Sequence, residues 1–127
     1  ETGQAKEIYL TSINSFYKKE DGEDLMSISD GIAGDKGNVH LSIGKPMNFE
    51  SDNYEEIANL ITKKIKSSYK NHPTNIAACI IQGIEIPQHN FTEIEIDEAM
   101  MYLNQRMNLI PEEMHPYLLK QYSNSVL

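Results

Sequence analysis

The chain has little that would support disulfide, membrane-spanning or nucleic-acid-binding structure. Its 127 residues contain one cysteine, Cys79, so no internal disulfide can form. No apolar run approaches the roughly 20 residues of a membrane-spanning helix. Lys and Arg number 11 against 19 Asp and Glu, which gives a net charge of −8. Phosphate binding needs clustered positive charge, so this balance argues against nucleic acid as a partner and, more weakly, against holding anionic lipid by charge alone.

The sequence also lacks a recognisable signal peptide. With one thiol and no membrane span, a reducing, cytoplasmic setting is expected. The chain begins at Glu1 without a Met. We therefore expect a processed or truncated piece of a longer protein.

Metal sites and an activated thiol are also not predicted. The four histidines, His40, His72, His89 and His115, form no HExxH, and no pair is spaced one helical turn apart. Cys79 lies in the apolar run "NIAACII", which favours a buried, inert thiol. A catalytic thiol requires a basic, open setting, and the neighbouring sequence supplies none.

Most of the chain has the periodicity of α-helices. Apolar residues recur at helical spacing in five main segments, and short polar residues that cap helices precede several of them. The expected helices are residues 4–19, a short turn within 25–34, 54–70 after the caps Asp52 and Asn53, a segment ending near 82, 93–107 after a Thr92–Glu95 capping box, and a last helix from Pro111.

One segment has the period of a β-strand. Val39, Leu41 and Ile43 alternate with polar residues, and Gly44 and Pro46 follow. A second strand in "AACIIQGIEI" is an alternative, although the preceding Thr74 and Asn75 favour a helix there. A lone strand leaves backbone groups unpaired. We therefore expect a mostly α fold with a small β remnant of an α/β parent, about five helices and one main strand that pairs outside this chain or across a dimer.

Glycines and lysines around this segment give the only candidate for anion contact. "GIAGDKG" precedes the expected strand and lacks the Lys-Ser/Thr ending of a phosphate loop, so a helix stop and a tight turn explain its glycines better. Lys36, Gly37 and Lys45 remain candidates for contact with an anionic substrate. No catalytic residue and no metal ligand is predicted. The carboxylates of 93–98 and the methionines of 100–114 are explained by a solvated helix start and by core packing.

Three segments resemble a known family. They are "GEDLMSISDGIAGDKGNVHLSIGKPM", which a helix follows, then "YKNHPTNIAACI", and a closing "LLKQYSNSV". Together they are similar to the C-terminal part of bacterial proteins of the phospholipid/glycerol acyltransferase family, in particular 1-acyl-glycerol-3-phosphate acyltransferase-like proteins. The similarity spans most of residues 5–125. Its most specific part is Gly-x-Lys-Gly-x-Val-His-Leu, from Gly34 to Leu41, and "HPTN" from His72 is the second anchor.

The resemblance implies that the catalytic residues lie in sequence upstream of Glu1. Such enzymes transfer an acyl group from acyl-CoA or acyl-carrier protein to glycerol phosphate or lysophospholipid, using a His and an Asp five positions apart. Here the residues five positions after the histidines are Lys45, Ala77, Ile94 and Lys120, and no Glu-Gly-x-Arg is present.

The resemblance thus implies that residues 1–50 are the C-terminal edge of an acyltransferase-like α/β domain and 51–127 a helical appendage. The expected partners are an upstream catalytic half, another copy through the strand edge, and a peripheral contact of the parent with the inner face of the membrane. No cofactor is expected in this chain. The alternative is a self-standing helical protein-interaction module that uses its apolar helix faces and Met-rich C-terminal half.

Overall fold

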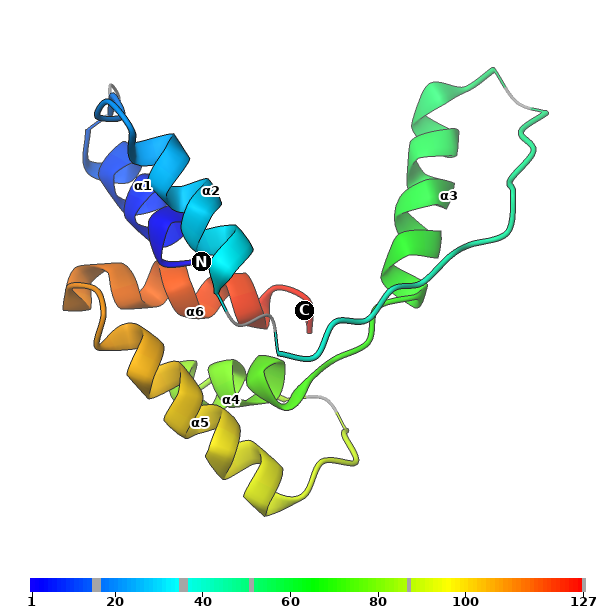
Figure 1. Cartoon of the computed structure of the whole chain (residues 1–127). Helices are drawn as coiled ribbons and strands as arrows, with labels where there is room; N and C mark the ends of the chain where they lie inside the picture. The colour runs from blue at the N-terminus through cyan, green and yellow to red at the C-terminus, as the bar shows by residue number, and fades with distance from the viewer. Residues whose placement is uncertain (15–16, 35–36, 51, 87, 127) are drawn as a thin grey trace. The chain divides into compact units, whose positions relative to one another are not determined.

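The computed structural model describes residues 1–14, 17–34, 37–50, 52–86 and 88–126. Within these residues the backbone forms six α-helices, one 3-10 helix and no β-strand (Figure 1). The elements are α1 (Thr2–Ile13), α2 (Glu23–Ala33), α3 (Tyr54–Ser67), α4 (Pro73–Gln82), α5 (Glu93–Met107), the 3-10 helix η1 (Glu112–Met114) and α6 (His115–Ser123).

The predicted β remnant is wrong. Residues 38–50 are extended or irregular, and no ladder forms anywhere in the described ranges. Val39, Leu41 and Ile43 are 78%, 79% and 87% exposed. An alternating pattern describes only which side chains share a face, whereas a strand requires a second backbone that supplies hydrogen bonds. Within the described residues nothing offers that backbone, so the predicted self-association through a strand edge loses its basis.

The chain divides into two compact units. One, the helical unit, comprises residues 1–35 and 71–127, and the other, the α3 unit, comprises residues 36–70. The division at residue 50 that the resemblance implies refers to a parent enzyme and stays a prediction.

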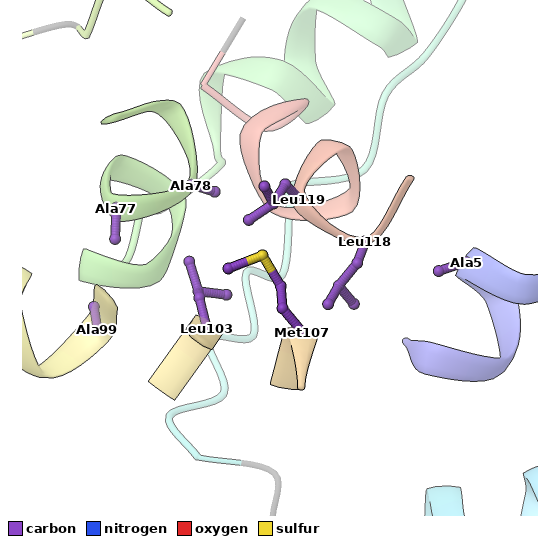
Figure 2. Packing of buried hydrophobic residues seen from close by; sticks show 8 residues of the cluster. All are labelled: Ala5, Ala77, Ala78, Ala99, Leu103, Met107, Leu118 and Leu119. Carbon is purple, nitrogen blue, oxygen red and sulfur yellow. The ribbon is translucent and has the colours of Figure 1, made fainter. Parts of the chain in front are cut away.

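The core of the helical unit lies between α4, α5 and α6. Figure 2 shows their buried side chains pointing toward one another, with Leu103 of α5 facing the alanines of α4 and the leucines of α6. Leu103 and Leu118 are fully buried. Alanines on α4 and α5 let the two helices approach closely. The cluster consists of Ala5, Ala77, Ala78, Ala99, Leu103, Met107, Leu118 and Leu119.

Local chemistry explains where α4 and α5 begin and end. Pro73 occupies the first turn of α4, where its missing N–H costs nothing. Gly83 ends that helix with φ +67°, a left-handed conformation that suits glycine, and the N–H of Ile84 donates to the Cys79 carbonyl at 2.9 Å. The predicted capping box of α5 is confirmed. The Thr92 N–H donates to Glu95 at 2.8 Å, and the Glu95 N–H donates to the Thr92 hydroxyl at 3.3 Å.

The first two helices join the core differently. In α1, Ala5 is fully buried and the Tyr9 ring packs edge-on against Tyr117 of α6 at 5.9 Å. The residues of α2 bury no side chain fully. The predicted helix over 4–19 is too long, because α1 ends at Ile13. Residues 15 and 16 of the predicted span lie outside the described residues.

In the α3 unit, the predicted cap of α3 is confirmed. The Asn53 side chain accepts the backbone N–H groups of Glu55 at 3.1 Å and Glu56 at 3.3 Å. The helix ends at Ser67, three residues before the predicted end at Lys70. It has no fully buried side chain.

Truncating Leu103 should show that the core of the helical unit depends on the apolar face of α5. We expect Leu103→Ala to lower the free energy of unfolding by about 2–5 kcal/mol, because it leaves a cavity where three helices meet. The measurement is urea unfolding followed by circular dichroism. Leu109→Ala is the matched control, since Leu109 is 66% exposed, and should change stability by less than about 0.5 kcal/mol. Equal losses in both variants would contradict this account of the core.

Candidate functional site

The predicted anion site is not assembled as a pocket by the described residues. Lys45 is exposed on the irregular segment, and Gly37 has φ +55°. Lys36 lies outside the described residues. The positive φ of Gly37 agrees with a tight turn at this point. Contact of Lys36, Gly37 and Lys45 with an anion therefore stays a prediction.

Two of the four histidines act as helix-end groups. The backbone N–H of His72 donates to the Asn75 Oδ1 at 2.6 Å, at the start of α4. The His115 Nε2 lies 2.9 Å from the Met107 carbonyl and 3.2 Å from the Ile110 carbonyl, where it satisfies the open end of α5. Both residues also lie at helix starts, His72 just before α4 and His115 at the first position of α6.

The other two histidines are also separate from any catalytic partner. The His89 ring stacks on Phe91 at 5.6 Å, and His40 is exposed on residues 38–50. Among the residues that the structure describes, no three His, Cys, Asp or Glu side chains are placed to hold a metal ion.

The predicted burial of Cys79 is confirmed. The side chain is fully buried in α4, and this burial raises the pKa of its thiol. A thiol with a raised pKa is a poor nucleophile at neutral pH, because the thiolate is the reactive form.

The "HPTN" anchor of the resemblance has a structural role. Asn75 accepts from the His72 N–H and also donates through Nδ2 to the Tyr122 carbonyl of α6 at 2.9 Å. One amide therefore caps α4 and ties it to α6. Gln82, at the other end of α4, repeats this link by donating to the Ser123 hydroxyl at 3.0 Å.

A charged cluster that sequence reasoning missed joins α1 to α2. The Tyr17 hydroxyl donates to both Glu23 oxygens at 2.6 and 2.7 Å, and the Lys6 Nζ lies 3.1 Å from Glu23. The Glu20 N–H donates to the same carboxylate at 3.1 Å. These hydrogen bonds, that of Tyr17 first, lower the pKa of Glu23 to about 2.

A second bridge reinforces this junction. The Lys19 Nζ lies 2.8 Å from Asp24 and 3.2 Å from Glu7, and its hydrogen bonds to them, that with Asp24 first, raise the pKa of Lys19. Most of these charges come from the run "KKEDGED", residues 18–24. Nothing in its spacing shows which carboxylate meets which cation.

A polar hollow lies where α1 meets α6. It is lined by Glu1, Gln4, Gln121, Tyr122 and Asn124. The Arg106 Nε lies 3.3 Å from a Glu1 carboxylate oxygen, and the Gln121 amide donates to the Glu1 carbonyl at 3.1 Å. Burial, together with Glu1, raises the pKa of the Tyr122 hydroxyl, so this phenol stays protonated. The hollow therefore offers hydrogen-bonding groups, and its phenol is not an anion at neutral pH.

The polar side chains discussed above cap helices, link helices to one another or lie exposed. Among the described residues, they do not come together as a catalytic group. No helix in the described ranges has the length and apolar character needed to cross a bilayer. Comparisons with protein-family models, with curated proteins and with solved structures each found no match.

Removing the Asn75 amide should weaken the tie between α4 and α6. We expect Asn75→Ala to cost about 1–2 kcal/mol of stability, because it removes a helix cap and the link from α4 to the Tyr122 carbonyl, which keeps only the Ser125 hydroxyl as a donor. Asn104→Ala, on the exposed side of α5, is the control and should be neutral or slightly stabilising. Chemical denaturation measures both, and an unaffected Asn75→Ala would refute the structural role of "HPTN".

The hydrogen bonds around Glu23 should be detectable in the pKa of its carboxyl group. We expect the Glu23 carboxyl, followed by NMR, to titrate near pH 2, well below its usual range. Because the pKa is lowered by folding, the stabilisation is complete above the ordinary pKa of a free Glu and is lost as pH falls toward 2.

Removing the main hydrogen-bond donor should reverse that shift. Tyr17→Phe should move the Glu23 pKa upward toward its usual range, since it deletes the largest cause. Tyr69→Phe, in the other unit, should leave it unchanged. An ordinary Glu23 titration in the unmodified chain would show that the cluster does not form.

Proposed function

We propose that this chain is the non-catalytic C-terminal portion of an acyltransferase-like enzyme that transfers acyl groups to glycerol phosphate or lysophospholipid. The resemblance from Gly34 to Leu41 and at "HPTN" is the basis of the assignment. The observation that carries it further is the exposure of Val39, Leu41 and Ile43, within the segment that bears the most specific part of the resemblance.

These exposed apolar side chains would be stabilised by packing against another protein surface. Burying each of them fully is worth roughly 1.5–3 kcal/mol. The described residues leave all three largely in water. An upstream catalytic half that packs against residues 38–50 would recover this free energy, and that is the partner we propose.

The chemistry would then reside outside these 127 residues. None of the histidines is followed five positions later by Asp, so no general-base dyad can be drawn here. Acyl-CoA or acyl-carrier protein would be the acyl donor, and Lys36, Gly37 and Lys45 would lie beside the anionic substrate. We further infer a cytoplasmic location, at the inner face of the membrane.

A second candidate function is a self-standing helical interaction module. The α4–α5–α6 core is closed without help from α2, while Leu25, Ile28 and Ile32 of α2 remain 58–77% exposed at helical spacing. Such a stripe is typical of a helix that packs against a partner. A stable monomer that captures a defined protein partner through these residues would favour this function.

Acyl transfer by the whole gene product is the test of the first proposal. The 127 residues are expressed together with the flanking coding sequence of their gene and assayed for release of the CoA thiol with glycerol phosphate or lysophospholipid as acceptor. We expect transfer by that product and none by the 127 residues alone. Leu41→Asp should lower the rate of acyl transfer, whereas Leu109→Asp, at an exposed position, should leave it unchanged.

Two results would refute the proposal. One is a gene that encodes no His and Asp five positions apart upstream of Glu1. The other is a folded product that carries such a pair and transfers no acyl group from acyl-CoA or from acyl-carrier protein.

A further inference from the structure

Positive charge is concentrated in one part of this acidic chain. Residues 57–84 contain no Asp or Glu, and four lysines, Lys63, Lys64, Lys66 and Lys70, fall within fifteen residues of its start. The α3 unit has six Lys and four Asp or Glu, a net charge of +2. Since the whole chain has a net charge of −8, the helical unit has a net charge of −10.

The lysines of α3 form no ion pair among the residues that the structure describes. The ion pairs found there join Lys6, Lys19 and Arg106 to carboxylates. Glu55 and Glu56 lie in the first turn and Lys64 and Lys66 in the last. The helix therefore presents its cations to whatever lies beside its C-terminal half.

The same helix has an apolar stripe. Ile57, Ile61 and Ile65 follow one another at intervals of four residues and share a face. Ile61 and Ile65 remain 38% and 48% exposed. At 100° per residue, Lys64 projects about 60° from the centre of this stripe, at one edge of it. Lys66 projects about 140° from the centre, on the polar face.

Tyrosines stand at both ends of the stripe. Tyr54, at the first position of α3, and Tyr69, just beyond its end, are both well exposed. A tyrosine has an apolar ring and a polar hydroxyl, and such residues favour the boundary between headgroups and acyl chains.

We propose that α3 is an interfacial helix that binds an anionic phospholipid surface, with Ile57, Ile61 and Ile65 toward the acyl chains and Lys64 at the phosphates. Lys66 adds positive charge from the polar face. An amphipathic helix with a lysine-rich polar face and low overall hydrophobicity is typical of a helix that lies in the membrane interface. Lysine ammonium groups are flexible point charges, which suits a diffuse layer of phosphates better than a defined protein carboxylate.

The acidic remainder of the chain does not prevent this binding. Exposed charges separated by more than about 10 Å are largely screened at 0.1 M salt. The attraction therefore depends on the charges next to the bilayer, and the C-terminal half of α3 and the residues after it carry no carboxylate as far as Glu85. This inference does not rest on the acyltransferase proposal, because it uses α3 alone.

Vesicle co-sedimentation of the full 127-residue chain is the test. The probes are vesicles of neutral phosphatidylcholine and of an equal mixture of phosphatidylcholine and phosphatidylglycerol. We expect partition onto the mixed vesicles to exceed that onto neutral ones by at least about tenfold, and to fall as salt is raised.

Charge variants locate the binding surface. K64Q/K66Q should lower the partition coefficient on mixed vesicles by roughly ten- to thirtyfold, since each lysine near the surface contributes. K18Q/K120Q removes the same charge from the helical unit and should leave partition unchanged. Equal losses in the two variants would overturn the assignment to α3.

Apolar variants test the stripe. I61N/I65N should lower partition by about tenfold, whereas I94N/M101N, which changes two exposed residues of α5, should not. Circular dichroism checks that helicity is retained. If I61N/I65N unfolds, the salt dependence and K64Q/K66Q still decide the result.

Other outcomes identify other partners. Equal binding to both vesicle types would overturn the electrostatic part of the proposal. Absence of binding to either vesicle, together with binding to soluble polyglutamate, would assign the lysines to an acidic protein partner instead and overturn the lipid assignment.

Discussion

The apolar face of α5 is the constraint on which the helical unit depends. Its buried residues, Ile96, Ala99, Leu103 and Met107, recur at three- and four-residue intervals and contact α4 on one side and α6 on the other. Because α4 is only ten residues long, its own backbone hydrogen bonds would not hold it in water. It is stable where it lies because Ala77 and Ala78 pack against α5, and because Asn75 and Gln82 tie its two ends to α6. The α1 helix is added to this core through Ala5 and Tyr9, and α2 is added to α1 by charge.

Local features of the sequence predicted the helices well, and the reason is physical. The Thr92–Glu95 box, the Asn53 cap and the Gly83 stop each act within a few residues, so they can be recognised in sequence and then observed at the same positions. The strand prediction at residues 39–43 failed because pairing is not local. An alternating pattern describes side chains, whereas a ladder requires a second backbone at the right distance. The Tyr17–Glu23 contact was missed for a related reason, since a run of charges does not show which of them meet once two helices pack together.

The candidate site divides in the same way. The burial of Cys79 could be judged from sequence because an apolar run surrounds it, and the structure places it in the core. The structure also places two of the histidines at helix ends. The anion contact at Gly37 and Lys45 could not be judged, because it depends on groups that the described residues do not bring together. The polar hollow at Glu1 and Tyr122 has no sequence signal at all, since its residues come from opposite ends of the chain.

The exposed apolar surfaces differ in charge, and this difference separates the partners that we propose. Residues 38–50 carry alternating apolar side chains with few charges, as expected of a surface that another part of a protein covers. The apolar stripe of α3 has Lys64 at its edge, and desolvating that ammonium group in a protein interface would be costly without a paired carboxylate. At a bilayer surface Lys64 keeps its ammonium group in water while its stem packs along the apolar stripe, so both parts of the helix are satisfied together. The charge beside each stripe, more than its apolar area, therefore decides which kind of partner it fits.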